Sequence, residues 1–253
     1  MALRAVVLAA GRGVRMGGAR PKTLIPIGDH EPLLYYLLKG VASVGVDDLL
    51  VVTGFSPADV HSYVDEHWSG RATFVRNARY ASWGNFHSVR VAIDQSPGLD
   101  LLVLNSDVVV HPDVLARTVD GIGDLVLAVQ GKDRLDPEEM RVTLDGDSVV
   151  AISKELPMPE SHGEFVGVSV LRPTAAGHYA HIATDLEWAA QTSLYYEDVY
   201  ARMLDSVDAR AARVDPGEYA EVDGADDVDA AEAVISTHEH AWEPAAPPVS
   251  EPA

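Results

Sequence analysis

Apolar runs with the length of buried strands alternate with helix-like segments through the first half of this chain. The strand-like runs cover residues 4–9, 48–54, 72–76 and 99–105, and the helix-like segments cover 32–44, 56–67 and a stretch that opens at His111. A continuous apolar run that ends in glycine, as the second one does, is typical of a strand in a parallel sheet. The alternation predicts a three-layer α/β fold around a doubly wound, mostly parallel sheet.

The pattern changes after residue 124, where strand-like runs follow one another with few helices between them. These runs cover 124–130, 140–144, 148–153 and 165–171, and Asp145-Gly146-Asp147 is typical of a hairpin turn. Helices are expected near 174–183, 194–205 and 225–237, with a short strand at 219–222. We therefore predict one domain over residues 1–240, a mixed β insertion at about 130–195, and a flexible Pro- and Ala-rich tail over 241–253.

Composition limits the chemistry that the chain can perform. It has 253 residues, no cysteine and a formal net charge of −20, so thiolate nucleophiles and cysteine-based zinc sites are excluded. Such an acidic surface repels nucleic acid and anionic lipid, and no apolar run approaches the roughly 20 residues that span a bilayer. We expect a cytoplasmic protein with neither partner, and a homodimer is one possible assembly. A phosphate site would need local positive charge.

A loop rich in glycine and arginine directly follows the first strand and supplies that charge. It contains Leu8, Ala9, Ala10, Gly11, Arg12, Gly13 and Arg15, and it leads to Pro21-Lys22. Glycines after a parallel strand let backbone N–H groups turn toward an anion, so the loop predicts a polyphosphate site. The glycine and lysine spacings differ from those of the Walker loop and of the dinucleotide fingerprint. The alternative is a flexible surface turn.

This loop resembles the signature loop of nucleotidyltransferases with a GT-A-like fold. That group includes the sugar-1-phosphate nucleotidylyltransferases and the bacterial choline-phosphate cytidylyltransferases. The resemblance implies that the loop wraps a nucleoside triphosphate, that Arg15 and Lys22 contact its phosphates, and that pyrophosphate leaves from beneath the loop. The turn from Ile27 to Leu33 is longer than in the family pattern, which affects a loop and leaves the chemistry unchanged.

Two aspartates are candidate ligands for Mg²⁺. Asp107 follows Asn105-Ser106 at the carboxyl end of a predicted strand, where open α/β sheets bind ligands, and Mg²⁺ is often held by one or two carboxylates together with phosphate oxygens. The family resemblance assigns Asp107 the same role and Ser106 a place beside the nucleotide. The segment from Glu221 to Asp227 resembles the E-[IV]-D-x-x-x-D element of the cytidylyltransferases, which makes Asp223 the second ligand. An ordinary helix cap is the alternative for Asp107.

The base side is expected between Asn77 and Val89. This stretch resembles N-x-x-Y-x-x-x-N-N-x-x-S-[LV] of the choline-phosphate and phosphonate cytidylyltransferases, so the resemblance favours CTP. Asn85 and Ser88 would open a helix and hydrogen-bond a base edge. Trp83 and Phe86 are equally compatible with ordinary core packing.

The acceptor side is expected in the second half of the chain. Lys154 is similar to the family lysine that contacts the acceptor phosphate, although it could be a solvated hairpin residue. The stretch around Glu164 and Gly167 resembles the acceptor strand, where a glycine lets the substrate lie against backbone. Glu197 and Asp198 are candidate contacts for the far end of the acceptor, and the neighbouring Tyr195 and Tyr196 could cage a cation or simply pack. Glu197 replaces a family aromatic, which favours a phosphonate over choline.

Together these features predict an Mg²⁺-dependent nucleotidyltransferase that transfers CMP from CTP to a small phosphonate or phosphomonoester and releases pyrophosphate. A sugar-1-phosphate nucleotidylyltransferase is the main alternative. A GT-A glycosyltransferase would be expected to carry Asp-x-Asp where this chain has Asn105-Ser106-Asp107. A non-catalytic nucleotide sensor would not need Lys22, Asp107 and Asp223 together.

Overall fold

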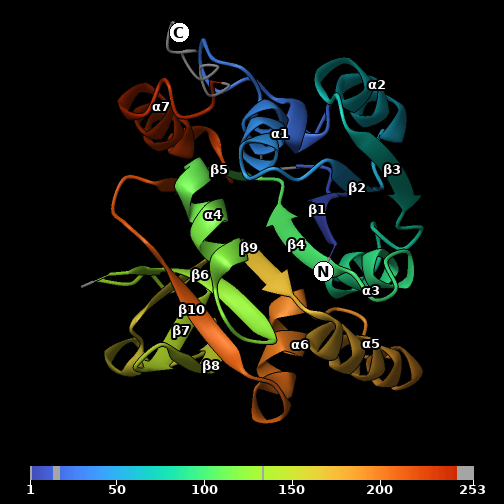
Figure 1. The fold of residues 1–253 in the computed structure, drawn as a ribbon, viewed down its shortest axis with the longest axis vertical. Coiled ribbons are helices and arrows are strands. Elements are labelled where there is room, and N and C mark those ends of the chain that lie inside the picture. Colours follow the sequence, from blue (N-terminus) through green and yellow to red (C-terminus); the bar gives the residue numbers. More distant parts are fainter. Residues whose placement is uncertain (1, 14–17, 133, 244–253) are drawn as a thin grey trace, which may run out of the picture.

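The computed structural model describes residues 2–13, 18–132 and 134–243. Their strands form one large and one small sheet. The large sheet contains β1 (Leu3–Ala9), β2 (Asp48–Thr53), β3 (Arg71–Arg76), β4 (Asp100–Asn105), β6 (Leu125–Gly131), β7 (Arg141–Asp145), β8 (Ser148–Ser153), β9 (Gly163–Leu171) and β10 (Ala209–Val214). Its strand order is β3-β2-β1-β4-β9-β6-β10-β8-β7 (Figure 1). The small sheet pairs β5 (Val108–Val110) with β11 (Tyr219–Glu221).

The large sheet is parallel in its first half and mixed in its second. Strands β3, β2, β1 and β4 are parallel, with Val7 of β1 opposite Val51 of β2 and Leu104 of β4. Strand β9 runs antiparallel between β4 and β6, and all of its residues are buried. Strand β7 pairs with β9 as well as with β8, so the end of the sheet curls back toward its middle. The prediction of a mostly parallel sheet is therefore confirmed for the first half, and the second half is mixed.

Helices cover both faces of this sheet. The described helices are α1 (Leu33–Ser43), α2 (Pro57–His67), α3 (Phe86–Asp94), α4 (Pro112–Asp120), α5 (Pro173–Trp188), α6 (Tyr196–Met203) and α7 (Val228–Thr237). Short 3-10 turns occur at Lys22–Leu24, Met158–Glu160, Leu204–Ser206 and Ala225–Asp227. Helices α3, α5 and α6 pack with one set of alternate strand residues, including Val6 and Val103, and α1, α2 and α4 pack with the other, including Val7 and Leu102. Because strand side chains alternate between the two faces of a sheet, these two sets of helices lie on opposite faces. The fold therefore has three layers, with the large sheet between two layers of helices.

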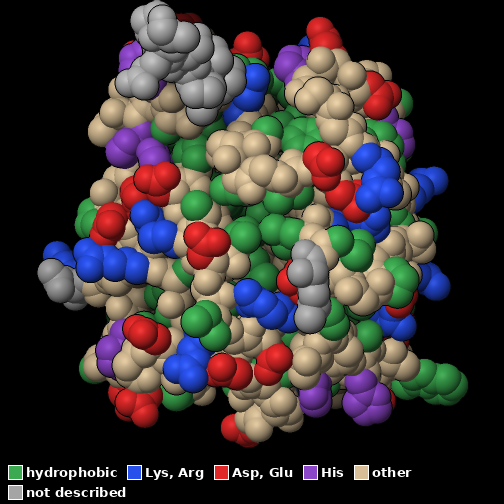
Figure 2. Space-filling model, in the orientation of Figure 1, with side chains coloured by type: hydrophobic (Ala, Val, Ile, Leu, Met, Phe, Trp, Pro, Cys, Tyr) green, Lys and Arg blue, Asp and Glu red, His purple; other side chains and the backbone are tan. Residues whose placement is uncertain are grey.

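A third core cluster attaches the C-terminal part of the chain. It joins α7 and the small sheet to α1, with Tyr36 and Trp242 in an edge-to-face contact at 5.2 Å between ring centroids. Trp242, near the start of the expected tail, is 5% exposed and packs in this cluster. None of the described helices is both long and apolar enough to cross a membrane. On the face shown in Figure 2, acidic and basic side chains are interspersed.

Candidate active site

The glycine-rich loop borders a cavity of about 490 Å³ at the carboxyl ends of β1 and β4. Of the loop residues predicted to bind nucleotide, Leu8, Ala10, Gly11 and Gly13 line this cavity. Ala9 does not, because its side chain points into the core on the opposite face of the sheet. Arg12 also lies outside the lining: its Nε donates to Gly18 O over 3.2 Å and its guanidinium covers the Phe55 ring. Arg15 lies outside the described residues.

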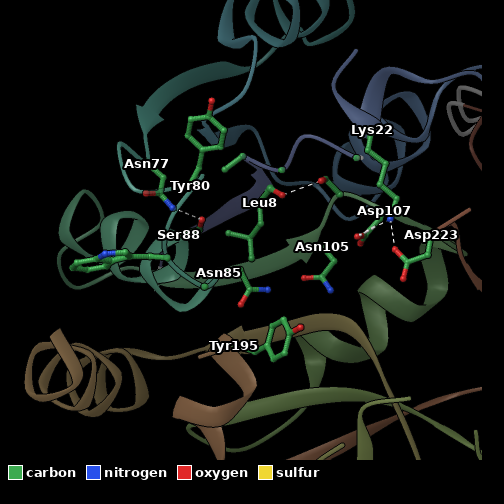
Figure 3. Close-up of a pocket in the computed structure, with 16 residues that line it drawn as sticks. Leu8, Lys22, Asn77, Tyr80, Asn85, Ser88, Asn105, Asp107, Tyr195 and Asp223 are labelled. Carbon is green, nitrogen blue, oxygen red and sulfur yellow. Dashed lines mark hydrogen bonds and ion pairs between the residues drawn. The ribbon is translucent and has the colours of Figure 1, made fainter. Parts of the chain in front are cut away.

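Lys22 joins the two predicted metal carboxylates on one side of this cavity (Figure 3). Its Nζ donates to Asp107 Oδ2 over 3.2 Å and contacts Asp223 Oδ1. Burial lowers the pKa of Lys22, but the charges of Asp107 and Asp223 and the hydrogen bonds to them outweigh that effect, so the pKa lies above its ordinary value. The lysine is therefore a charged group held between two carboxylates 201 and 85 residues away in sequence.

The carboxylates fit the requirements of a hard divalent cation. One ligand atom from each of Asp107, Glu221 and Asp223 lies within 4.8 Å of the others. Asp107 Oδ1 is buried and has no hydrogen-bond partner, so it offers a lone pair that the protein leaves unused. Partial desolvation, followed by the charges of Asp107 and Asp223, raises the pKa of Glu221 to about 8. Oxygen ligands at this density suit Mg²⁺. Glu221 is a member of the cluster that sequence reasoning did not single out as a ligand.

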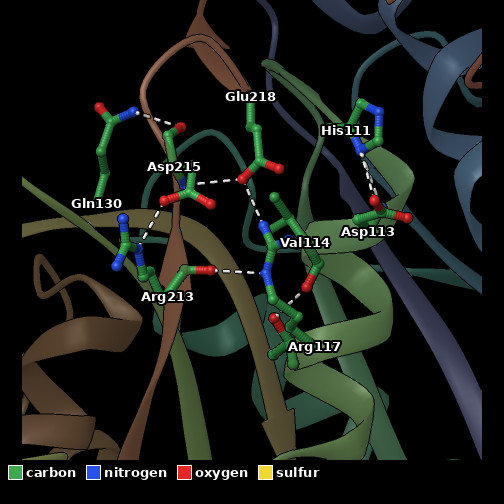
Figure 4. A network of polar contacts seen from close by, with 9 residues as sticks. His111, Asp113, Val114, Arg117, Gln130, Arg213, Asp215 and Glu218 are labelled. Atoms are coloured by element: carbon green, nitrogen blue, oxygen red, sulfur yellow. Dashed lines mark hydrogen bonds and ion pairs between the residues drawn. The ribbon is translucent and has the colours of Figure 1, made fainter.

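A polar network fixes the segment that carries Glu221 and Asp223 (Figure 4). Glu218 stands at its centre, where its carboxylate contacts Arg117 of α4 and accepts the Asp215 N–H over 2.7 Å. The Glu218 carbonyl also accepts the His111 N–H over 2.7 Å. Strand β11 then pairs with β5, and Asp107 O accepts the Val222 N–H over 2.8 Å. The network and the small sheet thus bring the C-terminal carboxylates against Asp107.

The opposite end of the cavity carries the residues predicted to recognise a base. Asn77 Nδ2 donates to Ser88 Oγ over 2.9 Å, and Asn77 Oδ1 accepts the Arg79 N–H over 2.8 Å (Figure 3). No described residue accepts the Ser88 proton, which leaves that hydroxyl able to donate into the cavity. Tyr80 and Trp83 also line this end, so Trp83 is not purely a core residue. Phe86, in contrast, is fully buried in the core.

Asn85 and Asn105 stand where this cavity meets a second one of about 530 Å³. Asn85 Oδ1 accepts the Tyr196 N–H over 2.9 Å, which ties α3 to α6. Tyr196 is fully buried and its hydroxyl donates to Asn105 Oδ1. Gly167 has φ of +77°, and a Cβ there would lie 2.6 Å from Asn105 Nδ2, so only glycine fits. Ser106, also expected beside the nucleotide, lines the first cavity and donates from Oγ to Leu8 O over 2.9 Å.

The second cavity brings together four of the residues that the sequence predicts to contact the acceptor. Lys154, Glu164, Gly167 and Glu197 all line it. Lys132, which sequence reasoning did not assign, donates to Glu139 Oε1 over 2.7 Å and contacts Glu164 Oε2. Glu164 is therefore already paired inside the protein. Lys154 is more weakly engaged, 3.9 Å from Glu138 and above the Tyr195 ring.

Glu197 and Asp198 have different roles although they are neighbours in sequence. Glu197 is 6% exposed, and its Oε2 has no hydrogen-bond partner. Burial raises the pKa of Glu197 to about 7. Asp198 does not line either cavity: its Oδ2 accepts the Tyr195 N–H over 2.7 Å and caps α6. The structure therefore places Asp198 at the helix N-terminus, where a carboxylate is stabilised by the helix dipole.

Solved structures with the same fold include three nucleotidyltransferases. An inositol-1-phosphate CTP transferase from T. maritima aligns with a TM-score of 0.77 and 18% identity, over 92% of this chain and 96% of its own. A CTP:phosphocholine cytidylyltransferase from Streptococcus pneumoniae gives 0.73 and 19%, over 93% and 100%. A putative glucose-1-phosphate thymidylyltransferase from Bacillus anthracis gives 0.77 and 17%, over 92% and 95%. These similarities confirm the predicted α/β fold.

Curated relatives match this chain over part of their length. CMP-5'-(3-aminopropyl)phosphonate synthase from Streptomyces rubellomurinus is 37% identical over 122 residues, which is 46% of this chain and 19% of that protein. Bifunctional protein GlmU from Ruegeria pomeroyi is 27% identical over 246 residues, which is 95% of this chain and 54% of that protein. The family model of the MobA-like NTP transferase domain matches residues 5–211. That match covers most of the chain and includes the glycine-rich loop, Asp107 and β9, so the chain belongs to the family of MobA-like NTP transferase domains.

Proposed function

We propose that this protein transfers CMP from CTP to a small acceptor that carries a phosphonate or phosphate group, and releases pyrophosphate. The observation that carries the proposal is the meeting of two cavities at one set of carboxylates. Asp107 and Asp223 line both, the glycine-rich loop lines only the first, and Lys154 lines only the second. A nucleotide and an acceptor bound in the two cavities would therefore meet beside Asp107.

The proposed reaction is an in-line displacement at the α-phosphorus. An acceptor oxygen forms a bond to that phosphorus while the bond to the bridging oxygen of the β-phosphate breaks, and pyrophosphate leaves with the electron pair. The attacking oxygen is already an anion at neutral pH, so no general base is needed. Catalysis then depends on alignment and on neutralisation of charge. We propose that Lys22 neutralises charge on the leaving pyrophosphate and that Arg15 assists it.

Asp107, Asp223 and Glu221 would hold Mg²⁺, which when bound supplies neutralisation of phosphate charge. The unpartnered Asp107 Oδ1 supports this assignment. The turn held by Glu218 keeps Asp223 close to Asp107 without help from the nucleotide. The protein therefore contributes a largely pre-formed set of oxygen ligands.

Cytosine is the proposed base. The Ser88 hydroxyl and the Asn77 amide lie at the end of the first cavity that is opposite Lys22 (Figure 3). Three of the similar proteins act with cytidine nucleotides according to their names, whereas the thymidylyltransferase has the same fold and is named for another base. The pattern of residues 77–89 therefore supports CTP more strongly than the fold does.

An acceptor with a positively charged end is proposed for the second cavity. Its described lining contains many carboxylates and a single lysine: Asp107, Asp136, Glu138, Glu139, Glu164, Glu197, Glu221 and Asp223 against Lys154. Lys154 would contact the phosphonate, and the unpartnered Glu197 oxygen would accept a hydrogen bond from an ammonium group. The name of the Streptomyces relative, a CMP-5'-(3-aminopropyl)phosphonate synthase, describes an acceptor of this chemistry.

A sugar-1-phosphate nucleotidylyltransferase is the second candidate. The specific observation in its favour is the similarity to GlmU, which extends over 95% of this chain. The carboxylates of the second cavity could accept hydrogen bonds from sugar hydroxyls. The ion pair between Lys132 and Glu164 favours the small acceptor. Because Glu164 is already paired with Lys132, its carboxylate is less available to accept hydrogen bonds from sugar hydroxyls.

A pyrophosphate-release screen tests the proposal. CTP, UTP, GTP and ATP are each combined with 2-aminoethylphosphonate, phosphocholine, a carboxylated phosphonate and glucose 1-phosphate, with the Asp107→Ala variant as the background control. We expect the highest turnover with CTP and the aminoalkyl phosphonate. Robust turnover of glucose 1-phosphate alone would assign the chain to the second candidate. Absence of release with every pair would contradict both.

A further inference from the structure

Lys22 occupies the position among the carboxylates where a metal ion would bind. Its Nζ lies 3.2 Å from Asp107 Oδ2 and contacts Asp223 Oδ1, and these two residues belong to the three-carboxylate cluster (Figure 3). The ammonium group donates to oxygens that are also candidate metal ligands. A divalent ion and an ammonium repel each other, so both cannot lie between the Asp107 and Asp223 carboxylates at the same time.

The same lysine lies directly against the phosphate loop. A Cβ on Gly13 would be 2.6 Å from Lys22 Cβ, so the loop backbone packs on the stem of the side chain. Gly13 and Lys22 both line the first cavity, together with Asp107 and Asp223. The lysine stem is long and flexible. A rotation about its terminal bonds can therefore move Nζ from the carboxylates toward the loop without movement of the backbone.

We infer that Lys22 exchanges partners during binding: it occupies the Asp107–Asp223 position before the substrates bind, and moves to the phosphates of the nucleotide when a divalent cation takes that position. The inference rests on the proposed function, because it requires a metal and a nucleoside triphosphate in the first cavity. It goes beyond a phosphate contact for Lys22. The lysine lowers the affinity of the empty site for metal, and the nucleotide restores that affinity by giving the lysine a new anionic partner.

Two consequences follow for binding. Metal binds weakly to the protein alone and more tightly when the nucleotide is present. By thermodynamic reciprocity, the metal increases the affinity for nucleotide by the same factor. Part of this coupling comes from direct contact between metal and phosphate, and the remainder comes from the exchange of Lys22.

Binding of Mn²⁺, followed by the electron paramagnetic resonance of the free ion, separates these two parts. Dissociation constants are measured with and without a CTP analogue that has a methylene bridge between its α- and β-phosphates. Lys22→Met keeps an unbranched stem against Gly13 and removes the charge. We expect it to tighten Mn²⁺ binding to the nucleotide-free protein about tenfold or more, and to reduce the coupling between metal and analogue. Lys39→Met, which makes the same change in net charge outside the two cavities, is the control and should change Mn²⁺ binding less than twofold.

The outcomes distinguish this inference from the proposed function. If the wild-type protein shows no coupling between Mn²⁺ and the analogue, the proposed function itself fails. If the coupling is present but Lys22→Met binds Mn²⁺ as weakly as the wild type, or more weakly, only the exchange of Lys22 is overturned.

The wild-type chain provides a second measurement that needs no variant. The sequence has four lysines, so mass spectrometry can follow the acetylation rate of each one. Saturating Mn²⁺ without nucleotide should release Lys22 from the carboxylates and raise its rate several-fold, while the rate at Lys39 stays constant. Addition of the analogue should protect Lys22 again. An unchanged rate at Lys22 on adding Mn²⁺ would contradict the exchange.

Discussion

The hydroxyl of Tyr196 donates a hydrogen bond to Asn105 Oδ1 over 2.9 Å, at the point where the two cavities meet. Tyr196 is fully buried, and its own backbone N–H is held by Asn85. The Asn105 amide is therefore fixed by a helix of the second half of the chain, although Asn105 belongs to strand β4, which ends two residues before Asp107. In the proposed reaction this contact would help to align the two substrates, on which an in-line displacement depends.

Asp107→Ala is expected to abolish turnover and to preserve the fold. Its Oδ1 has no partner in the described residues, and its Oδ2 contacts only Lys22. Loss of a metal ligand should cost several kcal/mol in the transition state, which corresponds to well over a tenfold loss in kcat. Steady-state pyrophosphate release measures the effect, with circular dichroism as the check on folding. A variant that keeps more than about a tenth of the wild-type kcat would exclude a metal-binding role.

Lys22→Ala and Lys154→Ala should change different kinetic constants. Of the two cavities, Lys22 lines only the first and Lys154 only the second. We expect Lys22→Ala to lower kcat at least tenfold with little change in the acceptor KM, because the lysine acts on the leaving pyrophosphate. We expect Lys154→Ala to raise the acceptor KM and to leave the KM for CTP nearly unchanged. A strong rise in acceptor KM for Lys22→Ala, with kcat preserved, would show that the assignment of Lys22 is wrong.

Ser88→Ala should relax the choice of base. Ser88 is 3% exposed and its hydroxyl accepts from Asn77, so removal of the hydroxyl leaves a buried amide donor without its partner. Discrimination between bases should fall by about tenfold or more, because it depends on buried polar groups that only the correct ligand satisfies. The measurement is kcat/KM for CTP relative to UTP. Ser82→Ala, an exposed serine on the same connection, is the control, and an equal change in both variants would contradict the role of Ser88.

Glu197→Gln should raise the acceptor KM for an aminoalkyl phosphonate above pH 7. The pKa of Glu197 is about 7, so the carboxylate that would bind an ammonium forms as pH rises through that value. In the wild type the KM should fall between pH 6 and 8 more steeply than in the variant, and subtraction of the two profiles removes the titration of the phosphonate itself. A carboxylated phosphonate should show little difference. Identical profiles for the two proteins with the aminoalkyl substrate would rule out contact with Glu197.

The same substitution should change stability in a defined direction. The folded pKa lies above the unfolded value of about 4.3, so the folded carboxyl keeps its proton while the unfolded one loses it. Stability therefore falls as pH rises from about 4.3 to 7, by at most about 3 kcal/mol. Glu197→Gln should be more stable than the wild type at pH 8 and nearly equal to it at pH 4, as measured by thermal unfolding. Equal melting temperatures at pH 8 would contradict the raised pKa.

Gly167→Ala should damage both binding sites. The new Cβ would lie 2.6 Å from Asn105 Nδ2, and the backbone would keep a positive φ, which costs roughly 1–3 kcal/mol. Displacement of Asn105 should raise the KM for CTP and for the acceptor together. Gly146→Ala is the matched control, because Gly146 also has a positive φ but has open space around it. If the two variants have the same kinetic constants, strain alone explains the effect of Gly167→Ala.

Much of the nucleotide half of the molecule could be predicted from the sequence. Strands β1, β2 and β4 are mostly apolar and are fully or largely buried, so local pattern and tertiary environment agree. The hairpin at Gly146 was also predictable, because its turn residues are specific to that geometry. The candidate site residues that follow β1 and β4 lie at the carboxyl ends of neighbouring parallel strands, and these ends meet at one edge of the sheet.

The remainder depends on contacts between distant segments. Strand β10 has the sequence Ala209-Arg-Ala-Ala-Arg-Val214, which has no strong strand propensity, and it forms because β6 and β8 flank it. The three-residue strand β5 requires β11 as its partner. Glu221 joins the carboxylate cluster only because this pairing aligns it with Val108, next to Asp107. Lys132 and Trp242 acquire partners through packing that no local pattern records.

Strand β9 begins beside β7, where Glu164 lies, and continues past Gly167, which lies where the two cavities meet, into the middle of the sheet. An extended strand rises about 3.3 Å per residue and cannot stretch, so these two positions are separated by at most about 10 Å. One wall of the second cavity is therefore a fixed length of backbone. If the proposed acceptor lies along this wall between Lys154 and Glu197, we expect acceptors to be selected by the number of carbon atoms between phosphorus and the charged end. A chain too short or too long by two methylene groups should lose its contact with one of these two side chains.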